Sequence, residues 1–378
     1  MTFPDTFPLD PSQLPMFADL RGVRPASEPA SDQGPGEAAF TCLVAQQIVD
    51  ADGRVVSHDL TVRGGAGLRT EPARREASAA SATRCVLSLA LLDAAGAGLT
   101  PPGPLFFSLD ASGLMGPLAE LVTPSIGVAV LGEDLPIDAD VLMRVAELRA
   151  RGHRFCIDGL RDLADLRWLL APYAEFLRLS EAVIASEQQE AVVARATGQG
   201  LSVIARDVHS LDDHRRLRRL GVAQFQGCFI SPPWSQSIRR LPGCDAVVLK
   251  RVRQLLLDRA SMQTLAIAVA ADPALVMRLV LLHRRYVSPT SDAPDLAGLL
   301  SSLGAGLLNG WLSVLPDTAC DVRGHQWVQS VRRQVDQYRQ RLYRKSGQGA
   351  EDVDAALWHF QRRLCEPRHH AKTLRHPV

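Results

Sequence analysis

The sequence lacks an excess of charge of either sign. Its 378 residues include 42 Lys and Arg against 41 Asp and Glu, for a net charge of +1. The overall charge therefore gives no general attraction to DNA or to an anionic membrane surface, and only a local patch could supply one. We expect no nucleic-acid partner and no membrane partner.

A membrane span and an export signal are also missing. No run reaches the roughly 18 uncharged apolar residues that a span requires, and residues 1–17 have no basic stretch followed by an apolar one. The seven cysteines are odd in number and contain no CxxC pair, so no disulfide framework can be read from them. These absences predict a cytoplasmic protein with reduced thiols.

Two kinds of segment make up the first 233 residues. Residues 1–37 are rich in Pro, Ser, Ala and Gly without sustained apolar periodicity, which predicts a flexible tail. From 38 to 233, short apolar strands alternate with helical stretches, as in parallel strands joined by crossover helices, and the number of repeats predicts a closed TIM-like (β/α) barrel. The expected strands are 39–49, 54–63, 105–110, 126–132, 154–160, 175–180, 201–208 and 223–230.

The alternation of strands and helices stops at three prolines within 231–243. We interpret residues 234–243 as a linker. From 244 to 346 the apolar residues recur three and four positions apart, which predicts a second, all-α domain. Residues 347–378 are expected to form one more amphipathic helix and a polar tail.

Four stretches of the first domain resemble EAL domains, the barrel enzymes that hydrolyse cyclic di-GMP. The opening of those domains is similar to QQIVDADGRVVSHDLTVR, and their closing QGY-F-x-x-P segment is similar to FQGCFISPP. RFCIDGL stands where the family has an Asp-Asp-Phe strand end, and SVIARDVHSLDDHRRLRRLG where it has Ala-Glu-Gly-Val-Glu and a helix. The resemblance covers roughly residues 38–233, in family order and spacing.

The resemblance implies a site for two metal ions, and here the sequence departs from the family. Two divalent cations such as Mg²⁺ or Mn²⁺ need several anionic oxygens. Only two carboxylates remain at the implied positions, Asp59 and Asp158, and Arg178 replaces a lysine on the catalytic side. We therefore expect no metal, no cofactor and no diester hydrolysis. The other implied positions hold Ser108, Ala129, Gly159, Arg206 and His209.

Loss of catalysis need not remove nucleotide binding, because arginine can hold a phosphate without a metal. Arg63 and Gln226 match the family's motifs. We favour an ion pair between Arg63 and Asp158 at the barrel mouth, with Gln226 satisfying backbone groups. Binding of cyclic di-GMP is the alternative. The candidate ligand-binding residues are Asp59, Arg63, Asp158, Arg178 and Gln226.

The helical half resembles HDOD domains, which often follow EAL barrels in bacterial signalling proteins. It departs from their pattern at His283 and Arg284, where the family has Asn-Ser, and it is cut short after about residue 345. The His-Asp metal pair of related hydrolases is absent from this half. The matching residues are Asp272, Pro273, Leu275, Arg278, Leu303, Gly304, Leu308 and Trp311.

The segment HQWVQSVRRQVDQYRQRLYRK, residues 325–345, carries a basic face and a short apolar seam. The seam lasts about two heptads, fewer than the three or four that identify a coiled coil. Packing onto its own domain is the interpretation we favour, ahead of a homodimer or partner contact, and nucleic-acid binding comes third. The seam residues are Val328, Val331, Val335, Tyr338 and Leu342.

These features together predict a catalytically inactive signalling protein that regulates an unidentified protein partner, with cyclic di-GMP as a candidate input. A ligand or partner at the barrel mouth would alter how the two domains pack across 231–243. The alternatives are a receptor module for cyclic di-GMP and a residual phosphodiesterase that uses Asp59 and Asp158.

Overall fold

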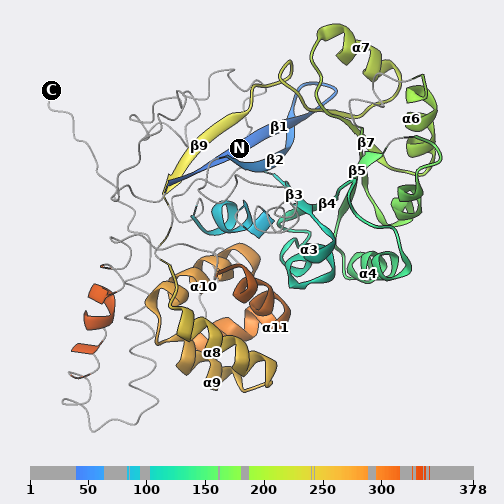
Figure 1. Ribbon diagram of the computed structural model, residues 1–378. Helices are drawn as coiled ribbons and strands as arrows, with labels where there is room; N and C mark the ends of the chain where they lie inside the picture. The colour runs from blue at the N-terminus through green and yellow to red at the C-terminus, as the bar shows by residue number, and fades with distance from the viewer. Residues whose placement is uncertain are drawn as a thin grey trace, which may run out of the picture.

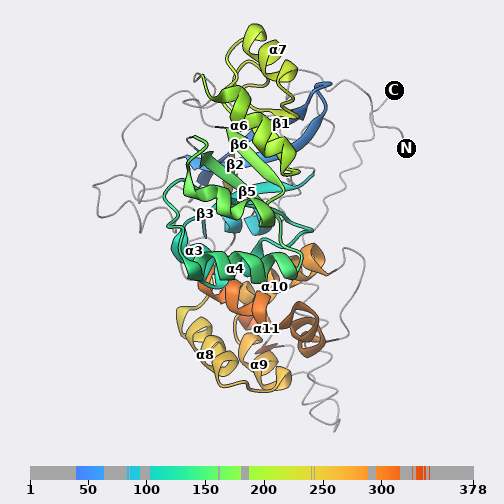
Figure 2. The ribbon, with the colours of Figure 1, turned by 90° about the vertical axis from the view of Figure 1, so that its right-hand side faces the viewer.

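The computed structural model describes most of the barrel and the helical domain. The described residues are 40–63, 83–84, 86–93, 103–160, 162–179, 187–239, 241, 243–287, 295–315, 326, 329–334, 336–337 and 340. The tails expected at 1–37 and 347–378 lie outside them. The barrel stacks above the helical domain in both ribbon views (Figures 1 and 2).

Eight strands close into the predicted barrel. Strand β1 (Phe40–Asp50) runs antiparallel to both of its barrel neighbours, β2 and β8, and the pairs from β2 to β8 are parallel. The predicted strands and the (β/α) barrel are thus confirmed. The remaining strands are β2 (Val55–Arg63), β3 (Leu105–Leu109), β4 (Gly127–Leu131), β5 (Phe155–Leu160), β6 (Phe176–Leu179), β7 (Ser202–Ala205) and β8 (Gln224–Phe225).

The turn between β1 and β2 shows how the sequence fixes the strand pair. Asp50 Oδ1 accepts hydrogen bonds from the backbone N–H groups of Asp52 and Arg54, both at 2.9 Å. Gly53 has a φ of +82°, in the left-handed region that favours glycine. This Asx-type turn sets a register in which Asp59 faces Gln46.

Helices cover the outside of the barrel, and most begin at a side-chain cap. Asp138 accepts from Val141 N at 2.9 Å and Ser210 accepts from Asp213 N at 3.1 Å, as N-caps do. The helix expected within 163–171 is a 3₁₀ helix with Pro172 inside it. The covering elements are η4 (Leu89–Asp93), α3 (Ala111–Met115), η5 (Pro117–Leu121), α4 (Ala139–Ala150), η6 (Leu166–Tyr173), α6 (Gln189–Gly198) and α7 (Leu211–Arg219).

The barrel has an inner core that is separate from the layer between strands and helices. Inside the barrel, Phe106 and Phe176 meet edge to face, with ring centroids 5.5 Å apart. The outer layer is continuous with the core of the helical domain, so one apolar cluster spans both domains. The inner cluster consists of Ile48, Phe106, Val128, Val130, Cys156, Phe176 and Ile204.

Residues 234–243, expected as a linker, contain a strand. Strand β9 (Trp234–Arg239) pairs antiparallel with the first half of β1, from Phe40 to Ala45. Prolines at 232 and 233 precede this strand rather than interrupt it, and proline is tolerated there because it removes no ladder hydrogen bond. The chain therefore leaves the barrel by extending its sheet.

Four helices of the second domain pack together: α8 (Ala246–Leu257), α9 (Met262–Val269), α10 (Pro273–Tyr286) and α11 (Leu296–Val314), and among the described residues 329–334 are helical as well. By length and hydropathy α11 would suffice to cross a membrane, contrary to the expectation from sequence. Its leucines, however, pack into the core of this domain. At Gly304, with φ 77° and ψ 158°, the helix breaks and restarts.

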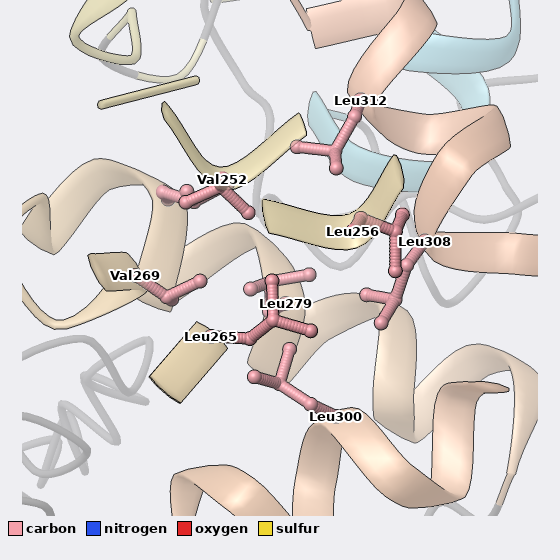
Figure 3. Close-up of a pocket in the computed structure, with 9 residues that line it drawn as sticks. Val252, Leu256, Leu265, Val269, Leu279, Leu300, Leu308 and Leu312 are labelled. Carbon is pink, nitrogen blue, oxygen red and sulfur yellow. The ribbon is translucent and has the colours of Figure 1, made fainter. Parts of the chain in front are cut away.

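A small apolar cavity of about 10 Å³ lies among these four helices (Figure 3). It is about the size of one water molecule, but no polar group lines it, so it gives water nothing to bind. We regard it as a packing defect of the helical core. Its lining residues are Val252, Leu256, Leu265, Val269, Leu275, Leu279, Leu300, Leu308 and Leu312.

Candidate functional site

The barrel brings four of the five candidate residues together. Asp59 lies on β2, Asp158 on β5 and Arg178 on β6, while Gln226 directly follows β8. The carboxyl ends of parallel strands open at one mouth of a barrel, so side chains from distant parts of the chain converge there. For the fifth, Arg63, the backbone pairs with Cys42, and its side chain lies outside the described residues.

Arg178 bridges the two acids. Its Nη1 donates to Asp59 Oδ2 at 2.7 Å, and its Nη2 donates to Asp158 Oδ2 at 2.6 Å. The Arg178 side chain is 3% exposed, and each carboxylate is 13% exposed. The planar fork of a guanidinium suits such a position, because it presents parallel N–H groups to carboxylate oxygens.

A second arginine completes the cluster. Arg206, the first residue after β7, donates from Nη1 to Asp158 Oδ2 at 3.1 Å and is 36% exposed. Asp207 adopts a left-handed backbone with φ 54° and is half exposed, with its carboxylate 3.9 Å from Arg206 Nε. Asp158 therefore pairs with Arg178 and Arg206 in this structure.

Gln226 binds side chains, where satisfaction of backbone groups was expected. Its Nε2 donates to Asp59 Oδ2 at 3.0 Å and to Gln46 Oε1 at 2.9 Å. The amide thus links Asp59 of β2 to Gln46 of β1. The earlier interpretation was wrong because sequence alone could not show that Gln46, on β1, faces the same mouth.

Burial and charge shift the pKa values of this cluster in consistent directions. Burial raises the pKa of Asp158, but the charges and hydrogen bonds of Arg178 and Arg206 outweigh it and hold that pKa below its ordinary value. Burial lowers the pKa of Arg178, and the two aspartates raise it beyond its ordinary value. Burial raises the pKa of the nearby Cys156 thiol, so this buried cysteine is a poor nucleophile. Asp158 therefore stays ionised and paired.

Gly159 stands where the resemblance implies a second aspartate, and its backbone is left-handed, with φ +69°. A Cβ there would lie 2.9 Å from Glu133 Cβ. The buried Arg167 donates to the carbonyl oxygens of Asp158 and Gly159, at 2.7 and 2.5 Å. These two hydrogen bonds hold a bulge in the β5–β6 pairing. Together with the close approach of Glu133, they leave no room for an acidic side chain at position 159.

Two other implied ligand positions differ from each other, because Ser108 faces the barrel interior and Ala129 faces away from it. Ser108 is paired in register with Val130, which faces the barrel interior. Ala129, aligned with a family glutamate, instead packs in the outer core. The inner face of β4 therefore presents valine, and His209 is exposed beyond the end of β7. The sequence could have shown this through the alternation of β4.

The residues at the mouth do not fit a pair of divalent cations. Within the described ranges, no group of three or more His, Cys, Asp or Glu side chains converges as a metal site. Hard cations need several oxygens, whereas the two carboxylates here already face guanidinium groups. The cluster holds two negative and two positive charges and is neutral overall.

No protein-family description and no curated protein matches the sequence. The barrel is similar to solved EAL-domain structures, each over about half of this chain. A PaMucR phosphodiesterase in complex with c-di-GMP matches at 20% identity and a TM-score of 0.42, over 50% of this chain and 90% of that one. An EAL domain protein from Listeria monocytogenes EGD-e matches at 17% and 0.40, over 50% and 87%. The EAL domain of Mycobacterium smegmatis DcpA matches at 18% and 0.40, over 52% and 93%.

Proposed function

We propose that this chain is a catalytically inactive EAL-type signalling protein that acts through protein contacts of its barrel and its HDOD-like helical domain. One observation carries the proposal: the Arg178 guanidinium lies between Asp59 and Asp158. A divalent cation entering this position would meet a fixed positive charge in a site of low dielectric, where repulsion is strong. Catalysis by two metals needs that position free.

Incubation of the purified protein with cyclic di-GMP tests this proposal. With excess Mg²⁺ or Mn²⁺ we expect no hydrolysed dinucleotide above the level without protein, measured by chromatography of the products. Asp158→Ala is the control that separates this chain's activity from a contaminating enzyme. Turnover that disappears in Asp158→Ala would support the residual phosphodiesterase instead, with Asp59 and Asp158 as its remaining ligands.

A receptor for cyclic di-GMP is the second candidate, and two features of the mouth favour it. Arg206 is 36% exposed and can reach a phosphate from the rim. Arg178 Nε and Gln226 Oε1 are buried without a hydrogen-bond partner among the described residues, so the mouth retains a donor and an acceptor. Calorimetric titration without metal distinguishes this function. A saturable heat that Arg63→Ala or Arg206→Ala abolishes would establish a receptor.

The proposal also concerns the helical domain, whose motif residues have structural roles. Asp272 caps α10 by accepting from Ala274 N at 3.1 Å, and it accepts from Asp245 N at 2.7 Å. Arg332, from the segment 325–345, pairs with Asp245 at 3.1 Å. Together with the buried Val331, this contact supports packing of that segment onto its own domain. A cytoplasmic protein partner would then dock on the outer surface of the two domains.

A further inference from the structure

The backbone of Leu241, where the barrel ends and the helical domain begins, is held from both sides. Its N–H donates to Asp93 Oδ1 at 2.8 Å, and Asp93 belongs to η4 of the barrel. Its carbonyl accepts from Arg278 Nη2 at 3.2 Å, and Arg278 belongs to α10 of the helical domain. The backbone of Leu241 therefore links Asp93 of the barrel to Arg278 of the helical domain.

Both of these side chains are buried charged types, which is uncommon without a specific role. Asp93 is 2% exposed and Arg278 is fully buried. Arg278 is also fixed within its own helix, since its Nη1 donates to Ala274 O at 3.4 Å. A buried polar group is costly when its partner moves away, so the two contacts resist any separation at Leu241.

A second contact joins the domains away from the linker. Gly310 of α11 lies so close to η5 that an added Cβ would be 2.5 Å from Leu121 Cδ2 and 2.8 Å from Pro117 O. Tyr286 Oη of α10 donates to Leu121 O at 2.8 Å. Helices α10 and α11 lie against the underside of the barrel in both views (Figures 1 and 2).

We infer that the barrel and the helical domain form one rigid body that is locked at Leu241. Under this inference the two domains keep one relative position, and the change of domain packing expected across 231–243 does not occur. Three independent observations agree: the shared apolar core, the two-sided hold on Leu241, and the glycine contact with η5. Interfaces that are large, apolar and specifically bonded are the ones that suppress relative domain motion.

Hydrogen exchange of the full-length protein tests the lock, followed by mass spectrometry of overlapping fragments that cover residues 236–246. We expect the Leu241 amide to be protected. Asp93→Ala removes its acceptor and should speed this exchange about ten- to hundredfold, as loss of a bond to a charged group implies. Asp93→Asn keeps an acceptor oxygen and is the matched control, expected to stay within about threefold of the wild type. A Leu241 amide that exchanges in the wild type as fast as in an unstructured peptide would overturn the inference.

The wild type alone provides a second test, which holds even if Asp93→Ala does not fold. With increasing denaturant, the most protected amides of α4 in the barrel and of α10 in the helical domain should exchange through one common opening, with one free energy and one denaturant dependence. Two openings of different denaturant dependence would show two independent units and would contradict a single rigid body.

Discussion

Arg178 determines the electrostatics of the barrel mouth. Its guanidinium pairs with both buried carboxylates, and Arg206 supplies the second positive charge of the cluster. A lysine at this position would offer one compact charge, whereas the arginine fork reaches both acids at once. Removal of these contacts should therefore destabilise the barrel.

Replacement of this arginine should cost stability. Arg178→Ala leaves Asp59 with Gln226 alone and Asp158 with Arg206 alone. Breaking a buried pair in this way costs about 3–5 kcal/mol of the free energy of unfolding. Guanidinium chloride denaturation at pH 7 measures the change. Arg154→Ala is the control, because Arg154 pairs with Glu175 near the surface and its loss should cost about 1 kcal/mol or less. Equal losses in the two variants would show that Arg178 has no special role.

Gly159 is a position where the backbone and its neighbours oppose an acidic side chain. Gly159→Asp adds a side chain to a left-handed backbone and drives Cβ against Glu133, so we expect a loss of about 1–3 kcal/mol and no binding of Mn²⁺ by calorimetry. Gly53→Asp is the control, because Gly53 also has a left-handed backbone but an added Cβ there would meet no atom within 4 Å. Its loss of stability therefore measures the backbone cost alone. A Gly159→Asp protein as stable as Gly53→Asp that also bound Mn²⁺ would reverse our account of this strand end.

At the scale of an element, the predictions from sequence agree with the structure for features that the residues of one strand or helix determine by themselves. Short apolar runs such as 105–107 and 127–131 predict buried strands, because turn or polar residues bound them. Ala129, aligned with a site position, instead packs in the outer layer, as the alternation along β4 would have indicated. The strand β9 was missed because its partner, β1, is about 190 residues away. Similarly, Arg178 was predicted at the site, but its bridge between Asp59 and Asp158 needed three strands to be placed together.

Helix α11 offers a matched pair of glycines that separates helix propensity from packing. Gly306→Ala adds a methyl group in open space and should stabilise the protein by roughly 0.5–1 kcal/mol, because alanine is the better helix former. Gly310→Ala gains the same propensity but pushes its methyl group into Leu121, so we expect a net loss of about 1–3 kcal/mol. Thermal denaturation of the two variants measures the difference. If both variants were more stable than the wild type, Gly310 of α11 would not lie in close contact with Leu121 of η5.

At the scale of the whole molecule, each domain buries apolar side chains against the other, and either domain alone would expose them to water. Residues of the barrel's outer layer and of α8 to α11 belong to one buried cluster. Exposed apolar patches of more than a few hundred Å² are rare on soluble monomers and favour association. The barrel should therefore depend on the helical domain for its solubility as well as for its stability.

Removal of the helical domain makes this dependence measurable. A chain ended at residue 243 keeps every barrel strand and β9, but it uncovers Leu121 and the Pro117 carbonyl, which now pack against α11. It also removes Arg278, so the Leu241 carbonyl loses its donor. We expect this fragment to bind a dye for exposed apolar surface, to aggregate at concentrations where the full chain is monodisperse, and to melt at a lower temperature. A fragment that stays monodisperse and melts at the temperature of the full chain would show that the barrel is complete without its helices, and the inference of a single rigid body would then lose its physical basis.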